Sequence, residues 1–204
     1  MDSIVEKCKV KIQLEAEALN RVSQQVDESY VQAVDAILNC KGRLIITGLG
    51  KTGHIGKKIA ASFASLGTKS FFVHSCESLH GDMGMIDKDD VVIMISNSGK
   101  SQEILSMLPT LKIIGTKTIS ITKSKDTPLA KSTDITIKVD AGPEIDHMGG
   151  LAPTASSTAA LAVGDALATV VSEMKGFTRS DFALSHPGGA LGQRLLTEYQ
   201  EMIK

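Results

Sequence analysis

The segment from Val91 to Glu103, VVIMISNSGKSQE, combines features that could bind an anion. Its apolar, β-branched run predicts a buried strand, which ends in a serine- and glycine-containing loop directly before a helical pattern. The first N–H groups of a helix have no partner within the helix and carry the positive end of its dipole. Phosphate suits such a place, and the residues expected to hold it are Ser96, Asn97, Ser98, Gly99 and Ser101. The simpler alternative is a serine that caps a surface helix.

A second glycine-containing loop, GLGKTGH, begins at Gly48 and matches the pattern G-x-G-x-x-G. A dinucleotide site would need an acidic residue at the tip of the next strand, where the chain has Val73-His74-Ser75. A Walker A loop would need a glycine at position 45, which is Ile. Both nucleotide interpretations therefore fail. A tight turn and an anion-attracting lysine remain, with Gly50, Lys51 and Thr52 as candidate ligand contacts and a solvated loop lysine as the alternative.

Side chains that could transfer protons follow the other predicted strands. His80 comes after the second strand, where a surface or core histidine is the commoner outcome. Glu103 lies in the first turn of its helix, where it complements the helix dipole or faces the ligand. Glu144 belongs to a glycine-rich loop, and His186 precedes a proline that restricts its backbone, although a simple turn between helices is the alternative there.

A third group of hydroxyls, at the start of a long apolar helix, again favours an anion. These residues are Thr154, Ser156 and Ser157. No histidine pair has the HExxH spacing of a zinc hydrolase, and no G-x-S-x-G motif indicates a serine hydrolase. Phosphate recognition combined with Glu, His and Lys suits proton transfer next to a carbonyl, a chemistry for which we expect neither a metal nor a cofactor.

Composition excludes several other classes of function. The 204 residues carry 22 Lys and Arg against 23 Asp and Glu, so there is no basic excess for nucleic acid or for a membrane surface. No apolar run approaches the roughly 20 residues that would span a bilayer. Cys8, Cys40 and Cys76 lack CxxC spacing and are predicted to be reduced, buried thiols. We therefore expect a cytoplasmic protein.

The elements that must position these residues follow a β-α-β alternation. Residues 3–25 and a second segment capped near Asp27 have helical periodicity. Strands are predicted at 44–47, 70–73, 91–95, 118–121 and 135–139, and helices at 52–66, 76–81, 101–114 and from Pro153, in the first turn, to about Lys175. The sequence predicts an α/β fold with a doubly wound five-stranded parallel sheet flanked by helices. One domain, 1–204, would comprise N-terminal helices (1–40), an α/β core (41–176) and a C-terminal tail with a helix (177–204).

Five motifs in order closely resemble the sugar isomerase (SIS) domain of arabinose-5-phosphate isomerases. They are GLGKTGHIGKKIAASFASLG, ESLHGDMGMI, ISNSGKSQEI, LAPTASSTAALAVGDAL and GFTRSDFALSHPGGALGQRLL. The SNSG-x-S motif alone is also typical of non-catalytic sugar-phosphate sensors, and the SHPGGALG tail narrows the family. The resemblance implies a flavodoxin-like sheet and interconversion of D-ribulose 5-phosphate and D-arabinose 5-phosphate through an enediol, the first step of Kdo biosynthesis.

The resemblance also implies roles for individual residues. The serines of the Ser96–Ser101 loop and the hydroxyls from Thr154 to Ser157 would hold the phosphate. The sugar would be surrounded by Lys51, His80, Glu103, Glu144 and His186. His186 would open the ring and protonate oxygen, either glutamate would take the carbon-bound proton, and Lys51 would support the enediolate. A homotetramer whose subunits share active sites is implied as well.

Two features depart from typical members of this family. The chain stops at Lys204, where typical members continue into a pair of CBS modules, so a free-standing catalytic domain is expected. CMP-Kdo, the nucleotide-activated product of the pathway, could then act in feedback by binding the SIS domain directly. The loop that contains Glu144 is one residue longer than usual and lacks the Cys-Pro of the family. An isomerase of another phosphosugar and a non-catalytic sugar-phosphate-binding module remain the alternatives.

Overall fold

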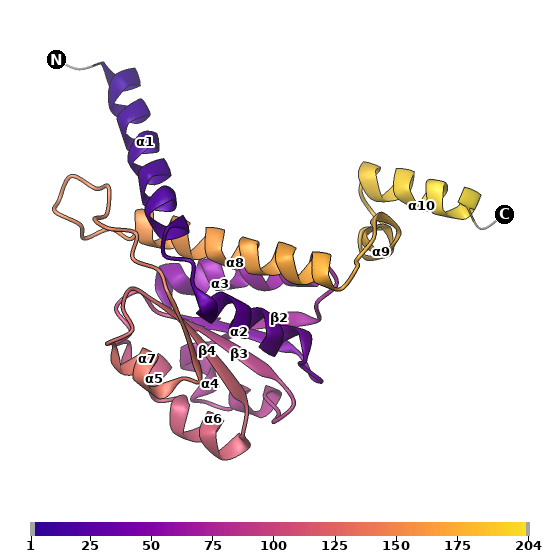
Figure 1. Ribbon diagram of the computed structural model, residues 1–204, viewed down its shortest axis with the longest axis horizontal. Coiled ribbons are helices and arrows are strands. Elements are labelled where there is room, and N and C mark those ends of the chain that lie inside the picture. The colour runs from indigo at the N-terminus through magenta and orange to yellow at the C-terminus, as the bar shows by residue number, and fades with distance from the viewer. Residues whose placement is uncertain (1–2, 203–204) are drawn as a thin grey trace.

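Five strands form one parallel sheet in the computed structural model, which describes residues 3–202 (Figure 1). The strands are β1 (Leu44–Gly48), β2 (Ser70–His74), β3 (Val91–Ile95), β4 (Lys117–Thr122) and β5 (Ile135–Lys138). Their order, β2-β1-β3-β4-β5, is that of flavodoxin-like folds, and it confirms the predicted doubly wound sheet. The direction in which strands are added reverses between β1 and β3, where such sheets bind ligands beyond the strand ends.

Helices cover both faces of this sheet because its apolar strand residues point alternately to either side. Leu44 and Ile46 of β1 belong to one hydrophobic cluster, while Ile45 belongs to the other. The first face carries α1 (Ile4–Ser23), α2 (Glu28–Leu38), α3 (Gly50–Ser65) and α8 (Ala155–Met174). The second carries α4 (Ser75–Ser78), η1 (Asp82–Met85), α5 (Gln102–Leu105), α6 (Leu108–Ile114) and α7 (Pro128–Ser132). Beyond α8 lie α9 (Arg179–Ser185) and α10 (Ala190–Met202) (Figure 1).

The close packing of α3 on α8 holds the first face together. A Cβ atom at Gly164 of α8 would come within 2.4 Å of the fully buried Ile59 side chain of α3, so the two helices meet at a residue without a side chain. By length and composition alone, α8 could cross a membrane, contrary to the expectation from apolar runs. However, 56% of its apolar window is buried inside the fold, as in the core helix of a globular domain.

Three local predictions from the sequence are wrong. The helix expected over residues 101–114 is interrupted between α5 and α6, because Pro109 has no N–H to bond the carbonyl four residues earlier. Pro153 lies before Thr154, the N-cap of α8, and therefore outside the first turn. Cys8 is exposed, because the first half of α1 projects away from the sheet (Figure 1), while Cys40 and Cys76 are only partly buried.

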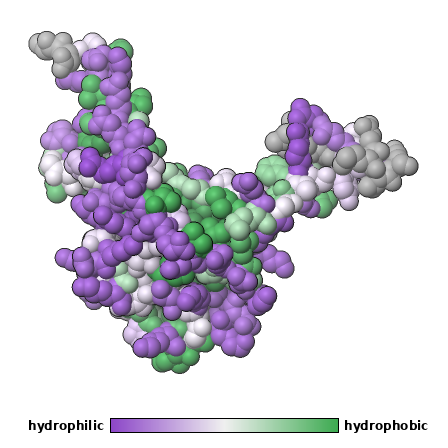
Figure 2. Space-filling model, viewed as in Figure 1, coloured by the Kyte–Doolittle hydropathy of each residue, from purple (hydrophilic) through white to green (hydrophobic). Residues whose placement is uncertain are grey.

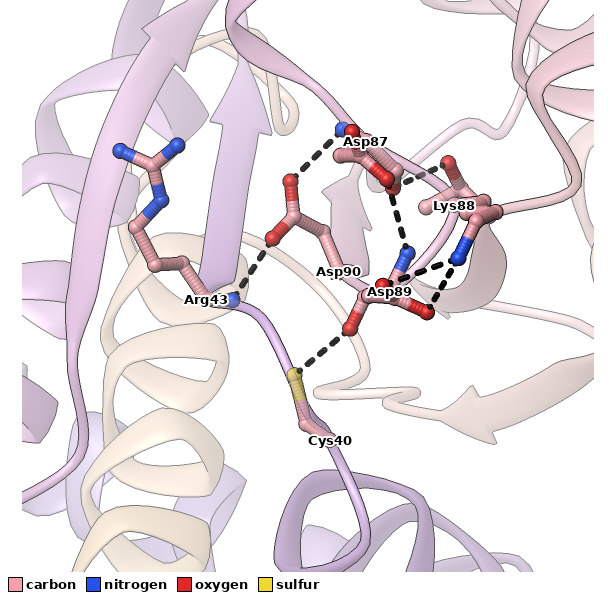
Figure 3. Close-up of polar contacts among 7 residues, drawn as sticks. Cys40, Arg43, Asp87, Lys88, Asp89 and Asp90 are labelled. Carbon is pink, nitrogen blue, oxygen red and sulfur yellow. Dashed lines mark hydrogen bonds and ion pairs between the residues drawn. The ribbon is translucent and has the colours of Figure 1, made fainter.

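At the amino ends of β1 and β3, a buried aspartate joins the two strands (Figure 3). The Asp90 carboxylate is 3% exposed and accepts hydrogen bonds from the Arg43 N–H at 2.6 Å and the Asp87 N–H at 2.8 Å. Gly42 adds a backbone bond to the Asp89 carbonyl at 2.8 Å, and a Cβ there would meet the Asp90 carboxylate at 2.2 Å. This polar junction lies at the edge opposite the loops that carry the predicted site.

Candidate functional site

The loop after β3 curls around its own serine side chains. Ser96, 3% exposed, accepts a hydrogen bond from the Gly99 N–H at 3.1 Å, and its Oγ lies 3.1 Å from the Ser101 Oγ. The Lys100 N–H donates to the Ser98 Oγ at 3.2 Å. Asn97 and Ser98 are exposed at the tip. Five of the eight residues predicted for the phosphate therefore lie in one polar, partly open loop.

Gly99 fixes this loop against α7. Its φ of +60° lies in the left-handed region, and a Cβ there would stand 2.4 Å from the Thr127 side chain. The Leu129 N–H donates to the Gly99 carbonyl at 3.1 Å, which ties the loop to the first turn of α7. The helix α5 is only one turn long, so its dipole is small. An anion would therefore be attracted mainly by the hydroxyl and N–H groups of the loop.

The loop after β1 presents Lys51 at the same edge of the sheet. Gly50 begins α3 with a φ of +56°, and Lys51 is exposed in the first turn. The Thr52 hydroxyl donates to the Leu49 carbonyl at 2.9 Å and accepts from the Leu49 N–H at 3.2 Å. Thr52 therefore shapes the turn, while the Lys51 ammonium group is left to face solvent or a ligand.

Glu144 occupies the N-terminus of α8, which the sequence predicted for phosphate. Its Oε2 accepts hydrogen bonds from the Thr154 N–H at 2.8 Å, the Thr154 hydroxyl at 3.1 Å and the Ser156 N–H at 3.1 Å. Burial raises the pKa of Glu144, but the hydrogen bonds from Ser156 and Thr154 outweigh it and hold the pKa below its usual value. The Ser157 hydroxyl bonds the Thr154 carbonyl at 2.9 Å. A phosphate could use these N–H groups only after displacing Glu144.

Two residues that sequence reasoning did not single out shape the loop around Glu144. The Asp146 carboxylate accepts hydrogen bonds from the N–H groups of Met148, Gly150 and Ala152 at 2.6, 3.1 and 2.7 Å. The Gln25 amide bonds both backbone groups of Asp140, at 2.8 Å to the carbonyl and 3.1 Å from the N–H. The Asp-x-x-x-Gly spacing is a local signal that could have indicated the role of Asp146 in this turn. No local signal indicates the contact between Gln25 and Asp140.

Two adjoining hollows connect the loops at the carboxyl edge. A small cavity is lined by Thr52, Asn97 and Ser156, together with apolar residues at the ends of β3, β4 and β5. A more open groove joins Asn97 to Lys123, Glu144 and Asp146. A larger hollow lies elsewhere, between α6 and α7, and none of the predicted site residues lines it.

The two predicted histidines lie in different places. His80 is exposed just after α4, and α4 packs against α5, so His80 belongs to the same edge as Glu103. His186 follows α9, beyond the C-terminal end of α8 (Figure 1). Since the 20 residues of α8 span about 30 Å, His186 is remote from the loops of its own chain. Within residues 3–202, no group of three His, Cys, Asp or Glu side chains could hold a metal ion.

Comparisons with known proteins identify the family of this chain. The SIS domain model matches residues 37–170. Arabinose 5-phosphate isomerase KdsD of Pseudomonas aeruginosa is 48% identical over 192 residues, and KdsD of Escherichia coli K12 is 46% identical over 190 residues. These alignments cover 94% and 93% of this chain, but the chain spans only 59% and 58% of the length of those relatives.

A solved structure extends the likeness to three dimensions. The E. coli CFT073 protein c3406, in complex with arabinose 5-phosphate, superposes with a TM-score of 0.88 and 44% sequence identity. The superposition covers 92% of this chain and 100% of that protein chain. The family model matches more than half of the chain, and the chain belongs to the SIS domain family.

Proposed function

We propose that this protein is an aldose-ketose isomerase that interconverts D-ribulose 5-phosphate and D-arabinose 5-phosphate, the first step of Kdo biosynthesis. The observation that carries the proposal is the likeness to the 44% identical c3406, over all of that protein chain, in its complex with arabinose 5-phosphate. The polar loop from Ser96 to Ser101 supports it, since its hydroxyl and N–H groups suit a phosphate. Charge-assisted bonds of roughly 1.5–3 kcal/mol each would orient a small flexible sugar.

In the proposed reaction, a base removes the proton from C2 of the open-chain aldose and returns it to C1 of the enediol. Glu103 fits this role better than Glu144, because the hydrogen bonds that stabilise the Glu144 carboxylate also weaken it as a base. Glu103 is half-buried and directly follows the Ser96–Ser101 loop. A base for a sugar whose phosphate is bound by that loop needs such a nearby position. His186 would open the sugar ring and exchange protons with the two oxygens, while Lys51 would stabilise the developing negative charge.

A homotetramer with shared active sites is part of the proposal, and the position of His186 supports it. The histidine is remote from the loops of its own chain, so it would serve a neighbouring subunit. Exposed apolar side chains offer surfaces for association, and Figure 2 shows several along α1 and across the middle of the molecule. Among them are Ile4, Val5 and Ile12 of α1, which are 81%, 76% and 71% exposed, and Val170 and Met174 of α8.

The first test is incubation of the purified protein with D-ribulose 5-phosphate in D₂O, followed by NMR of the sugars. Formation of D-arabinose 5-phosphate with deuterium at C2 would support the proposed reaction and a solvent-exchanging enediol. Formation of a different aldose phosphate would favour an isomerase of another phosphosugar. Binding without isomerisation would favour the sugar-phosphate-binding module, and either result would contradict the proposal.

Direct feedback by CMP-Kdo stays a separate prediction. Isothermal titration calorimetry of the purified protein with CMP-Kdo tests it, with D-arabinose 5-phosphate as the reference ligand. Absence of heat with CMP-Kdo, when the sugar phosphate binds, would contradict it.

A further inference from the structure

The imidazole ring of His186 is held by a second aromatic ring from the same helix. Phe182, one turn earlier in α9, stacks on it with ring centroids 3.8 Å apart and an angle of 11° between the planes. Both side chains are half-buried, so this stack limits the rotation of a histidine that otherwise lies at a helix end.

Phe182 also determines which nitrogen of His186 carries a proton. The Nδ1 atom lies 2.9 Å from the Phe182 carbonyl oxygen, which can only accept a hydrogen bond. A hydrogen bond to that oxygen requires the tautomer in which Nδ1 carries the proton, whereas the Ser185 hydroxyl, 3.0 Å from Nδ1, can donate or accept. In that tautomer Nε2 is the ring nitrogen with a free lone pair.

The backbone of His186 is fixed from the opposite side by α10. A Cβ atom at Gly192 would come within 1.5 Å of the His186 carbonyl oxygen, so α10 crosses the chain at this point with no room for a side chain. At the start of α9, the Thr178 hydroxyl accepts from the Asp181 N–H at 3.2 Å, and the Asp181 carboxylate accepts from the Thr178 N–H at 2.8 Å. The cap at the start of α9 and the close approach of α10 after its end thus hold the segment that contains His186.

We infer that Phe182 is a positioning residue for His186: its ring orients the imidazole, and its carbonyl keeps the proton on Nδ1 so that Nε2 faces the sugar. This inference rests on the proposed function, in which His186 transfers protons between the sugar oxygens. A ring held in one tautomer and one orientation needs no rearrangement at the moment of transfer. A freely rotating histidine would present the correct nitrogen for only part of the time.

The test compares Phe182→Leu with Phe182→Tyr in the full-length protein. Phe182→Leu removes the aromatic face, and we expect kcat to fall about 10–100-fold with KM changed by less than about twofold. Phe182→Tyr keeps the ring and should restore kcat. Ser185→Ala, which removes the other neighbour of Nδ1 at 3.0 Å but leaves the stack intact, should retain kcat within about twofold.

A second readout does not depend on turnover. In ¹⁵N-labelled protein, the His186 nitrogens should show the Nδ1–H tautomer in the wild type and Phe182→Tyr. Phe182→Leu keeps the backbone carbonyl but removes the stacked ring, so the imidazole can rotate away from that carbonyl and a mixture of tautomers is expected. Wild-type kcat in Phe182→Leu, or failure of Phe182→Tyr to restore a loss, would overturn the inference. If the wild type shows no isomerase activity, the proposed function fails, and the tautomer measurement still decides whether Phe182 orients the ring.

Discussion

At the scale of single residues, Glu144 has a structural role as a helix cap that the sequence did not predict. Its type and its place in a flexible loop made it a candidate base, but its Oε2 caps α8 through the Thr154 and Ser156 N–H groups. Carboxylates at helix N-termini are stabilised in their charged form, which disfavours proton uptake. Glu103 accepts no such set of hydrogen bonds within residues 3–202, which is why the proposed reaction uses it as the base.

We expect Glu144→Gln to lower stability at neutral pH by about 1 kcal/mol, the usual value of a helix cap. The folded-state pKa of Glu144 lies below its unfolded value, so the charged group stabilises the fold above the unfolded pKa of about 4.3. That stabilisation is lost as the pH falls through the lower folded-state pKa. Urea unfolding at pH 7 and at successively lower pH should therefore show the difference from the wild type shrinking.

Glu103→Gln is the matched variant. It should lower kcat by about 10²–10⁴-fold while leaving the urea midpoint close to that of the wild type. The reverse pattern, with Glu144→Gln inactive and equally stable at all pH values, would show that Glu144 is the base.

At the scale of elements, the junction between β1 and β3 depends on one buried carboxylate. Replacing Asp90 by Ala leaves the Arg43 and Asp87 N–H groups without their acceptor, and we expect a loss of about 2–3 kcal/mol of unfolding free energy. Asp89→Ala is the control, because the exposed Asp89 carboxylate pairs only with Lys88, at 3.0 Å, among the residues described. Chemical denaturation of both variants measures the difference, and equal midpoints would contradict the role assigned to Asp90.

At the scale of the whole molecule, the chain holds the loops of the sheet edge at one end of α8 and His186 beyond the other (Figure 1). If a site combines Glu103 of one subunit with His186 of another, two inactive variants should complement each other. Glu103→Gln and His186→Ala, unfolded and refolded together in equal amounts, should recover about a quarter of wild-type activity, because each mixed site needs one intact residue from each variant. Turnover of D-ribulose 5-phosphate measures the recovery.

Each variant refolded alone provides the control, and size-exclusion chromatography with light scattering shows whether mixed oligomers form. Mixed oligomers without recovered activity would contradict a site that combines Glu103 of one subunit with His186 of another.

The sequence by itself determined the sheet, its two faces and the place of the serine-containing loop after β3. Continuous apolar runs such as Val91–Ile95 predict a strand that is buried on both faces. The serines and the glycine that follow in the sequence must then lie at the end of that strand. The break before α6 was not predicted, although its cause is local, since Pro109 lacks a backbone N–H. These features depend on residues that are close neighbours in the chain.

Only the tertiary structure decided which polar groups meet across the fold. The bonds of Gln25 to Asp140 join residues 115 positions apart, and no periodicity indicates them. The distance of His186 from the loops at the carboxyl edge of the sheet depends on the length and direction of α8. This helix places α9 and α10 beyond its C-terminal end, away from those loops. Hydrogen-bond partners and distances of this kind arise from packing, because burying a polar group requires a partner that the local sequence does not specify.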